Sequence, residues 1–402
     1  MKSLRRFGPG LLVTAAFIGP GTVTTASQAG AGYGFTLLWA VLFAVLATIV
    51  LQEMAARLGI VSRQGLGEAV RSTFPHPALR FLAAGLIVAA IGFGNAAYQT
   101  GNVTGAAIGL AALMPVSFRI WTLIVGLAAF VLLATGTYKL IERVLIVLVV
   151  LMSGLFLFTA IVVRPDLGEL LAGAFVPQVP TGSLTTVLAL IGTTIVPYNL
   201  FLHAASVREH WPETVPRGEA LAESRLDTVL AVAIGGLITA AIMTTAAAAF
   251  FPGGRIENAA DMARQLEPAL GGRGATVLFS IGLLAAGLTS AVTAPLAAAY
   301  AVAGALGWPL DLKSWRLRGV WFAVLATGTT LAATRGRSPA ETIVAAQVAN
   351  GLLLPLIAVF LLVAVNRRRL MGDHANGVVA NLLGASVVLV ATAFAAYRLV
   401  TL

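Results

Sequence analysis

The residues of this chain that could do chemistry lie at two breaks inside long apolar stretches. The first stretch reads FIGPGTVTT, with Gly19 and Gly21 on either side of Pro20, and the second reads IGTTIVPYNLFLH around Pro197. A proline removes one backbone donor and clashes with the preceding turn, while glycine adopts backbone angles that other residues resist. An interrupted helix frees backbone carbonyls and exposes helix ends, which can bind an ion or a small polar solute. The two breaks therefore predict a substrate site.

Neutral polar side chains surround both breaks, and no carboxylate falls at either one. The candidates are Thr22, Thr24, Thr25 and Gln28 at the first break, Thr193, Thr194, Tyr198, Asn199 and His203 at the second, Asn95, Tyr98, Gln99, Asn102 and Thr104 in GFGNAAYQTGNVTGA, and Gln347 and Asn350 in AAQVANGLLLP. Polar residues at this density in apolar helices usually face the bundle interior or a water path. Any single one could instead make an ordinary interhelical hydrogen bond. His203 is a candidate for proton transfer, and a neutral hydrogen-bonded histidine fits the sequence equally well.

The composition places these breaks in a membrane. Of the 402 residues, 58% are hydrophobic and only 10% are charged, and long apolar runs recur from end to end. Soluble proteins have about 25% charged residues. The net charge of +10 is spread over short loops, which indicates topology rather than nucleic-acid binding. The chain has no cysteine and no embedded acid at the breaks, so we expect a transporter with no catalytic residues and no cofactor, not an enzyme.

Glycine, proline and charged residues separate the apolar stretches of the sequence. Their positions predict one all-α integral membrane domain over residues 1–402 with about eleven spans. The expected spans are 9–31, 35–59, 79–113, 118–136, 140–163, 183–207, 226–251, 275–306, 318–334, 340–365 and 377–400. Of the 26 Lys and Arg residues, 18 fall in segments that a cytoplasmic N-terminus would place inside and 8 in segments that it would place outside. This asymmetry favours a multi-pass protein of the cell membrane, in contact with lipid, with the N-terminus inside and the C-terminus outside.

Two acidic positions have structural explanations in the sequence. Glu53 precedes Arg57 by four residues near the end of the second span, a spacing at which a helix forms an ion pair. Asp227 falls at the expected start of the seventh span. We therefore expect neither carboxylate to take part in transport.

The breaks occupy corresponding places in two halves of the chain. The first and sixth spans each open a set of five, which predicts repeat one at about 8–163, repeat two at about 183–366 and an extra helix at about 377–400. Interrupted helices at matching positions are typical of inverted-repeat transporters, whose substrate lies near the bilayer midplane. A simple proline kink in a packed helix is the alternative for either span alone.

These motifs resemble the natural resistance-associated macrophage protein (NRAMP) metal transporters. The resemblance runs from GPGLLVTAAFIGPG, SQAGAGYGFTLLWA and LQEMAARLGIV through GTTIVPYNLFLHAASV and LFSIGLLAAGLTSAVTAPLA to NRRRLMGDHAN. It covers nearly the whole chain in the family's order. It implies a LeuT-type 5+5 inverted-repeat fold, with helices 1 and 6 broken, and transport of transition metals.

The sequence departs from the family where the metal should bind. The family motif DPGN is GPGT here, so its aspartate position is Gly19 and its asparagine position is Thr22. The family motif MPH is VPY, which puts Val196 in place of methionine and Tyr198 in place of histidine. The resemblance aligns two acidic residues linked to proton movement with Gln99 and Asn102. It also aligns His203 with a family histidine and Gln347 with a polar ligand.

The lost ligands change the expected substrate. A dehydrated transition metal needs anionic oxygen or soft donors, whereas Mg²⁺ keeps most of its waters and suits a roomier neutral site. We expect a carrier of hydrated Mg²⁺ or another divalent metal ion that works by alternating access with weak or no proton coupling. Two alternatives stay open: a carrier of a small neutral or zwitterionic organic solute, and a transport-inactive membrane sensor or scaffold. The sequence leaves the oligomeric state open.

Overall fold

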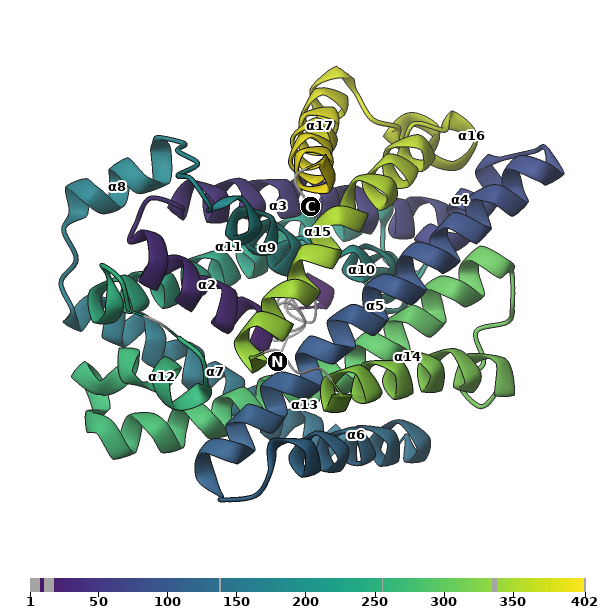
Figure 1. The fold of residues 1–402 in the computed structure, drawn as a ribbon. Helices are drawn as coiled ribbons and strands as arrows, with labels where there is room; N and C mark the ends of the chain where they lie inside the picture. The colour runs from purple at the N-terminus through teal and green to yellow at the C-terminus, as the bar shows by residue number, and fades with distance from the viewer. Residues whose placement is uncertain (1–7, 11–17, 137–138, 255, 335–337, 401–402) are drawn as a thin grey trace.

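The computed structural model describes residues 8–10, 18–136, 139–254, 256–334 and 338–400. Within these ranges the chain is built from helices (Figure 1). They are α2 (Pro20–Tyr33), α3 (Leu38–Ser62), α4 (Leu66–Thr73), α5 (Pro77–Leu113), α6 (Phe118–Thr135), α7 (Lys139–Val162), α8 (Leu167–Phe175), α9 (Leu184–Thr194), α10 (Pro197–His210), α11 (Arg217–Phe250), α12 (Ala259–Ala263), η2 (Arg264–Leu266), α13 (Glu267–Leu306), α14 (Trp315–Thr334), α15 (Pro339–Val365), α16 (Arg368–Met371), η3 (Gly372–His374) and α17 (Val378–Val400).

Nine helices in the described part of the chain are long and apolar enough to cross a membrane. They correspond to the second to eighth, tenth and eleventh expected spans, with α9 and α10 together forming the sixth. The first part of the first span, up to Phe17, falls mostly outside the described residues, and α2 is its second part. The ninth span is the helix α14, which carries Arg316 and Arg318 and does not reach the same apolar threshold.

The crossing of α5 and α13 is the most extensive helix contact in the structure. Gly287 on α13 lies so close to α5 that an added Cβ would come within 2.6 Å of the Ala106 nitrogen. On the same helix α5, Gly105 receives the ring of Pro20, and a Cβ there would collide with it. Small residues let two helix backbones approach closely in a membrane, where packing replaces the hydrophobic effect. Pro20, at the first break, therefore packs against α5 where α5 crosses α13.

The broken helices lie inside the bundle. In Figure 1, α2, α9, α10 and α15 occupy the centre, while α6 and α14 lie side by side at the lower edge and α17 stands at the upper edge. The outer helices α6 and α17 bury only four residues each, because most of their apolar side chains face outward, as they would toward lipid. The centre is instead almost wholly buried. The fold thus encloses the residues around both breaks.

The seventh span starts earlier than its expected position. Helix α11 begins at Arg217, so Asp227 lies well inside it and is only 2% exposed. The Asp227 carboxylate accepts hydrogen bonds from the backbone N–H groups of Gly8 at 3.0 Å and Gly10 at 2.6 Å. Sequence periodicity missed this because the partners are more than two hundred residues away. Helix α13 is interrupted at Gly271, whose φ of 69° is not helical, so the long helix of the eighth span begins just after it, close to the expected residue 275.

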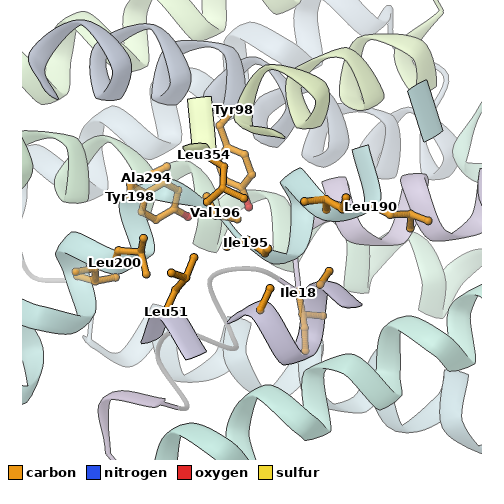
Figure 2. Close-up of a cluster of buried hydrophobic side chains, with 14 of the residues drawn as sticks. Ile18, Leu51, Tyr98, Leu190, Ile195, Val196, Tyr198, Leu200, Ala294 and Leu354 are labelled. Atoms are coloured by element: carbon orange, nitrogen blue, oxygen red, sulfur yellow. The ribbon is translucent and has the colours of Figure 1, made fainter. Parts of the chain in front are cut away.

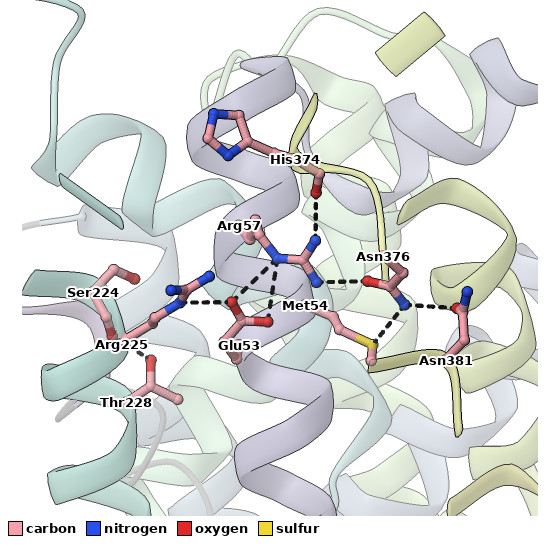
Figure 3. A network of polar contacts seen from close by, with 9 residues as sticks. All are labelled: Glu53, Met54, Arg57, Ser224, Arg225, Thr228, His374, Asn376 and Asn381. Atoms are coloured by element: carbon pink, nitrogen blue, oxygen red, sulfur yellow. Dashed lines mark hydrogen bonds and ion pairs between the residues drawn. The ribbon is translucent and has the colours of Figure 1, made fainter. Parts of the chain in front are cut away.

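A polar network ties α3 to α11 and to the loop before α17 (Figure 3). Glu53 forms the expected ion pair with Arg57 at 3.1 Å and a second one with Arg225 of α11 at 3.0 Å. Arg57 also donates to the His374 carbonyl at 2.5 Å and to the Asn376 side chain at 2.6 Å. The Arg57 side chain is 7% exposed, whereas that of Arg225 is 59% exposed. Arg57 is therefore the buried centre of the network.

We expect Arg57→Ala to destabilise the protein more than Arg225→Ala. Removing Arg57 leaves the half-buried His374 carbonyl and the Asn376 amide oxygen without this donor and should lower the free energy of unfolding by about 2 kcal/mol. Removing the exposed Arg225 should lower the free energy of unfolding by at most about 1 kcal/mol, because solvent screens its ion pair. Thermal unfolding midpoints of the two variants in the same detergent measure the difference. Equal shifts would contradict the central role of Arg57.

Candidate functional site

The two helix breaks lie against each other in the centre of the structure. Gly19 has an extended backbone before α2 begins at Pro20, and Ile195 and Val196 are non-helical between α9 and α10. The hydroxyls of Thr22 and Thr193 are hydrogen-bonded across the junction at 2.9 Å. Two segments far apart in the sequence therefore share one polar centre, as the paired breaks predicted.

The break in the sixth span satisfies only part of its own backbone. Ile195 N–H still bonds the Ile191 carbonyl at 2.8 Å, and Asn199 N–H bonds the Val196 carbonyl at 3.0 Å. The Thr194 carbonyl receives a long hydrogen bond of 3.5 Å from the Thr48 hydroxyl of α3. Both α2 and α10 begin at the junction, and a helix N-terminus carries a partial positive charge. The junction thus offers carbonyl oxygens and positive helix ends together.

Two buried amides at the junction have no hydrogen-bond partner among the described residues. Both polar atoms of the Asn199 side chain and both of the Gln347 side chain are unpaired, and neither residue is exposed. The Gln347 amide is wedged between α2 and α5: a Cβ at Gly21 would collide with it, and one at Gly101 would lie 3.6 Å from its Nε2. A buried unpaired amide is costly. The amide atoms of Asn199 and Gln347 are therefore available as hydrogen-bond donors and acceptors.

Aromatic and apolar side chains close the other side of the junction. The rings of Tyr98 on α5 and Tyr198 on α10 meet edge to face with centroids 5.5 Å apart. Figure 2 shows both rings beside Ile195 and Val196, with all four residues in one buried cluster. Val196 offers no donor atom to an ion. The aliphatic side chain therefore helps to seal the site rather than to ligate.

The three residues of the expected polar path are buried and hydrogen-bonded. Gln99 donates from Nε2 to the Ala291 carbonyl of α13 at 3.1 Å, and Asn102 donates to Gln99 Oε1 at 3.4 Å. His203 contacts Gln52 of α3 through Nδ1 at 2.9 Å, while its Nε2 has no partner among the described residues. Gln99 and Asn102 thus connect α5 to α13, and His203 lies on α10 beyond the break.

Other polar candidates fall outside the junction. Thr24 donates to the Met262 sulfur at 3.6 Å, and Thr194 bonds its own helix at Leu190. Gln28 lines a separate cavity of about 540 Å³ at the far end of α2, together with Glu257 and Glu341. The structure therefore brings Thr22, Thr193, Gln347 and Tyr198 to the junction beside Gly19. Asn199 lies in the first turn of α10, and Gln28 lies apart.

Sequence reasoning missed Ser290 of α13. Its hydroxyl is buried without a partner among the described residues, and it lies 3.0 Å from the position of a Cβ at Gly19. LFSIGLLAAGLTSAVTAPLA contains two serines, and nothing in the sequence singles out Ser290, because its place at the junction depends on how α13 crosses α5. No group of three or more His, Cys, Asp or Glu residues that could hold a metal occurs in the described part of the chain.

Comparison with known sequences identifies a family. The profile described as "Natural resistance-associated macrophage protein-like" matches residues 10–401. The "Divalent metal cation transporter MntH" of Yersinia pestis (strain Pestoides F) is 31% identical over 407 residues, which cover 99% of this chain and 95% of the relative. The protein of the same name from Pectobacterium carotovorum subsp. carotovorum (strain PC1) is 30% identical over 405 residues, covering 99% and 94%.

Comparison with solved structures shows the fold. The Eremococcus coleocola manganese transporter, solved with an aromatic bis-isothiourea substituted compound, matches with a TM-score of 0.79 and 23% identity, over 98% of this chain and 85% of that one. MhsT in complex with L-phenylalanine matches with a TM-score of 0.61 and 18% identity, over 98% and 97%. The expected all-α LeuT-type fold with broken helices 1 and 6 is confirmed. The chain belongs to the NRAMP-like family of membrane transporters.

Proposed function

We propose that this protein is a secondary transporter that moves a divalent cation across the cell membrane by alternating access, with hydrated Mg²⁺ as its substrate. The observation that carries the proposal is the pair of buried, unpaired amides of Asn199 and Gln347 where two interrupted helices meet. The relatives named as divalent metal cation transporters supply the class of ion. In this proposal the N-terminus is cytoplasmic, and residues 1–402 act as a single transport domain with two repeats.

The chemistry of the junction favours an ion that keeps its water. The site residues provide only amides, hydroxyls and backbone carbonyls, with Gly19 and Val196 at the two positions where the family has charged and soft ligands. Neutral groups cannot replace the full hydration shell of a divalent ion. Mg²⁺ dehydrates reluctantly and is commonly held through its waters. Amide and hydroxyl groups can bond those waters without touching the metal.

Asn199→Ala tests the contact to the hydrated ion. We expect purified protein in liposomes to show saturable Mg²⁺ uptake, and the variant to raise the half-saturating concentration about three- to tenfold because one hydrogen bond to the ion's shell is lost. The control is Thr392→Ala, on the outer helix α17, whose hydroxyl bonds only its own helix. Absence of flux with every divalent ion tested would reject the proposed function.

Gly19→Asp tests the reason for the altered substrate. The extended backbone at Gly19 accepts any residue, and an aspartate there would form the N-cap of α2 after a shift of a few tenths of an ångström at Ser290. We expect the variant to gain thermal stabilisation by Mn²⁺ that the parent lacks. Gly32→Asp, in open space at the other end of α2, is the matched control. Stabilisation of both variants alike would point to a surface charge effect.

Proton coupling should be weak. The two family acid positions carry Gln99 and Asn102, which hydrogen-bond to each other, and amides do not titrate. We expect Mg²⁺ uptake to leave the internal pH of the liposomes unchanged, as followed with an enclosed pH-sensitive dye. A pH change that depends on uptake and is lost in His203→Gln would instead assign a proton path to His203.

A small zwitterionic organic solute is the second candidate. The observation that favours it is the start of both α2 and α10 at a junction without a charged side chain, since a helix N-terminus can hold a carboxylate. Thermal stabilisation by members of an amino-acid library, without stabilisation by Mg²⁺, Mn²⁺ or Ca²⁺, would select this function over cation transport.

A further inference from the structure

Ser290 occupies the space beside the first helix break. A Cβ placed at Gly19 would meet its Oγ at 3.0 Å and the Tyr98 hydroxyl at 3.7 Å. The Ser290 side chain is 1% exposed and reaches the junction from α13, outside both broken helices. Gly19 has no side chain that could fill the space beside this hydroxyl. Ser290 therefore faces the junction at the place where a side chain on residue 19 would lie.

The Ser290 hydroxyl differs from the threonine hydroxyls next to it on α13. The neighbouring Thr289 donates to the Ala285 carbonyl at 2.8 Å, and Thr293 donates to the Thr289 carbonyl at 2.9 Å. A buried serine in a helix usually makes the same bond to the preceding turn. Ser290 has no such partner among the described residues. A buried hydroxyl left unpaired costs free energy unless a ligand or water completes it.

The helix around Ser290 is held in place by α5. Gln99 donates to the Ala291 carbonyl at 3.1 Å, and Asn95 donates to the Ala294 carbonyl at 2.9 Å. Both amides are buried, and the two helices share the most extensive contact in the structure. A binding group is positioned most precisely when a rigid element carries it. The backbone that carries Ser290 is thus held against α5.

We propose that Ser290 contacts the transported substrate and sets its specificity, supplying a neutral oxygen from α13 where position 19 has no side chain. The inference rests on the proposed function and extends it: the hydroxyl bonds a water of the hydrated divalent cation. The substrate is then held between Asn199 on a broken helix and Ser290 on the α5 and α13 pair. A neutral oxygen at this place favours an ion that retains its shell over one that must exchange water for an anionic ligand.

A single thiol provides the test, because the chain contains no cysteine. Ser290→Cys in liposomes is treated with a small water-soluble alkylating reagent, with and without MgCl₂. We expect the thiol to react, and Mg²⁺ at about ten times its dissociation constant to slow the reaction about tenfold by occupying the site. The control is Ser280→Cys, also buried and unpaired, about 15 Å away along the same helix, where Mg²⁺ should have no effect.

The outcomes separate this inference from the proposed function. The role of Ser290 is overturned, and the proposed function stands, if Mg²⁺ uptake persists and the thiol at position 290 never reacts. The same conclusion follows if the thiol reacts equally fast with and without Mg²⁺ while uptake persists. Protection by an amino acid but not by any divalent cation keeps Ser290 as a contact and rejects the proposed substrate. Protection at both positions 290 and 280 indicates a global change and also overturns the inference.

A second pair of variants covers the case in which Ser290→Cys does not fold. We expect Ser290→Ala to raise the half-saturating Mg²⁺ concentration about three- to tenfold with little change in maximal rate, and Ser290→Thr, which keeps the hydroxyl, to restore it in large part. A purely structural serine would lower the amount of folded protein in Ser290→Ala without changing half-saturation. That result would overturn the proposal.

Discussion

The constraint on which the structure depends is that an interrupted helix in an apolar layer must find its polar partners within the protein. The breaks before Pro20 and Pro197 meet this requirement by lying against each other, with Thr22 and Thr193 hydrogen-bonded across the junction. The α5 and α13 crossing then supplies the surrounding wall, including the small residue Gly105 that receives the Pro20 ring. The central packing is thus arranged around two short non-helical segments.

The absence of charge at the junction changes what the fold can bind. The two non-helical positions before Pro20 and Pro197 are Gly19 and Val196, and neither side chain has an atom that could bind an ion. The polar groups that remain are neutral and come from several helices: Asn199 from α10, Gln347 from α15 and Ser290 from α13. Their polar atoms have no partner among the described residues, whereas the amides of Gln99 and Asn95 donate to α13 carbonyls. The amides that hold α13 in place are therefore different from those left unpaired.

The charged residues form their ion pairs and hydrogen bonds away from the junction. Arg57 joins α3 to the loop before α17, Glu53 links it to Arg225, and Asp227 holds the backbone of Gly8 and Gly10 at the start of the first span. Charge in a membrane protein is stable where partners or water compensate it, which favours helix ends. The junction is therefore neutral, and the charged side chains make their hydrogen bonds and ion pairs elsewhere in the structure.

The sequence by itself determined the helical membrane fold, most span positions, the two breaks and the neutral character of the site, because hydropathy, proline and glycine act locally along the chain. It also gave the Glu53 and Arg57 pair, since four residues make one helical turn. Only the tertiary structure decided that Thr22 meets Thr193, that Asp227 is buried against Gly8 and Gly10, and that Ser290 reaches Gly19. Those contacts depend on how helices cross, and the crossing is set by packing between residues far apart in the sequence.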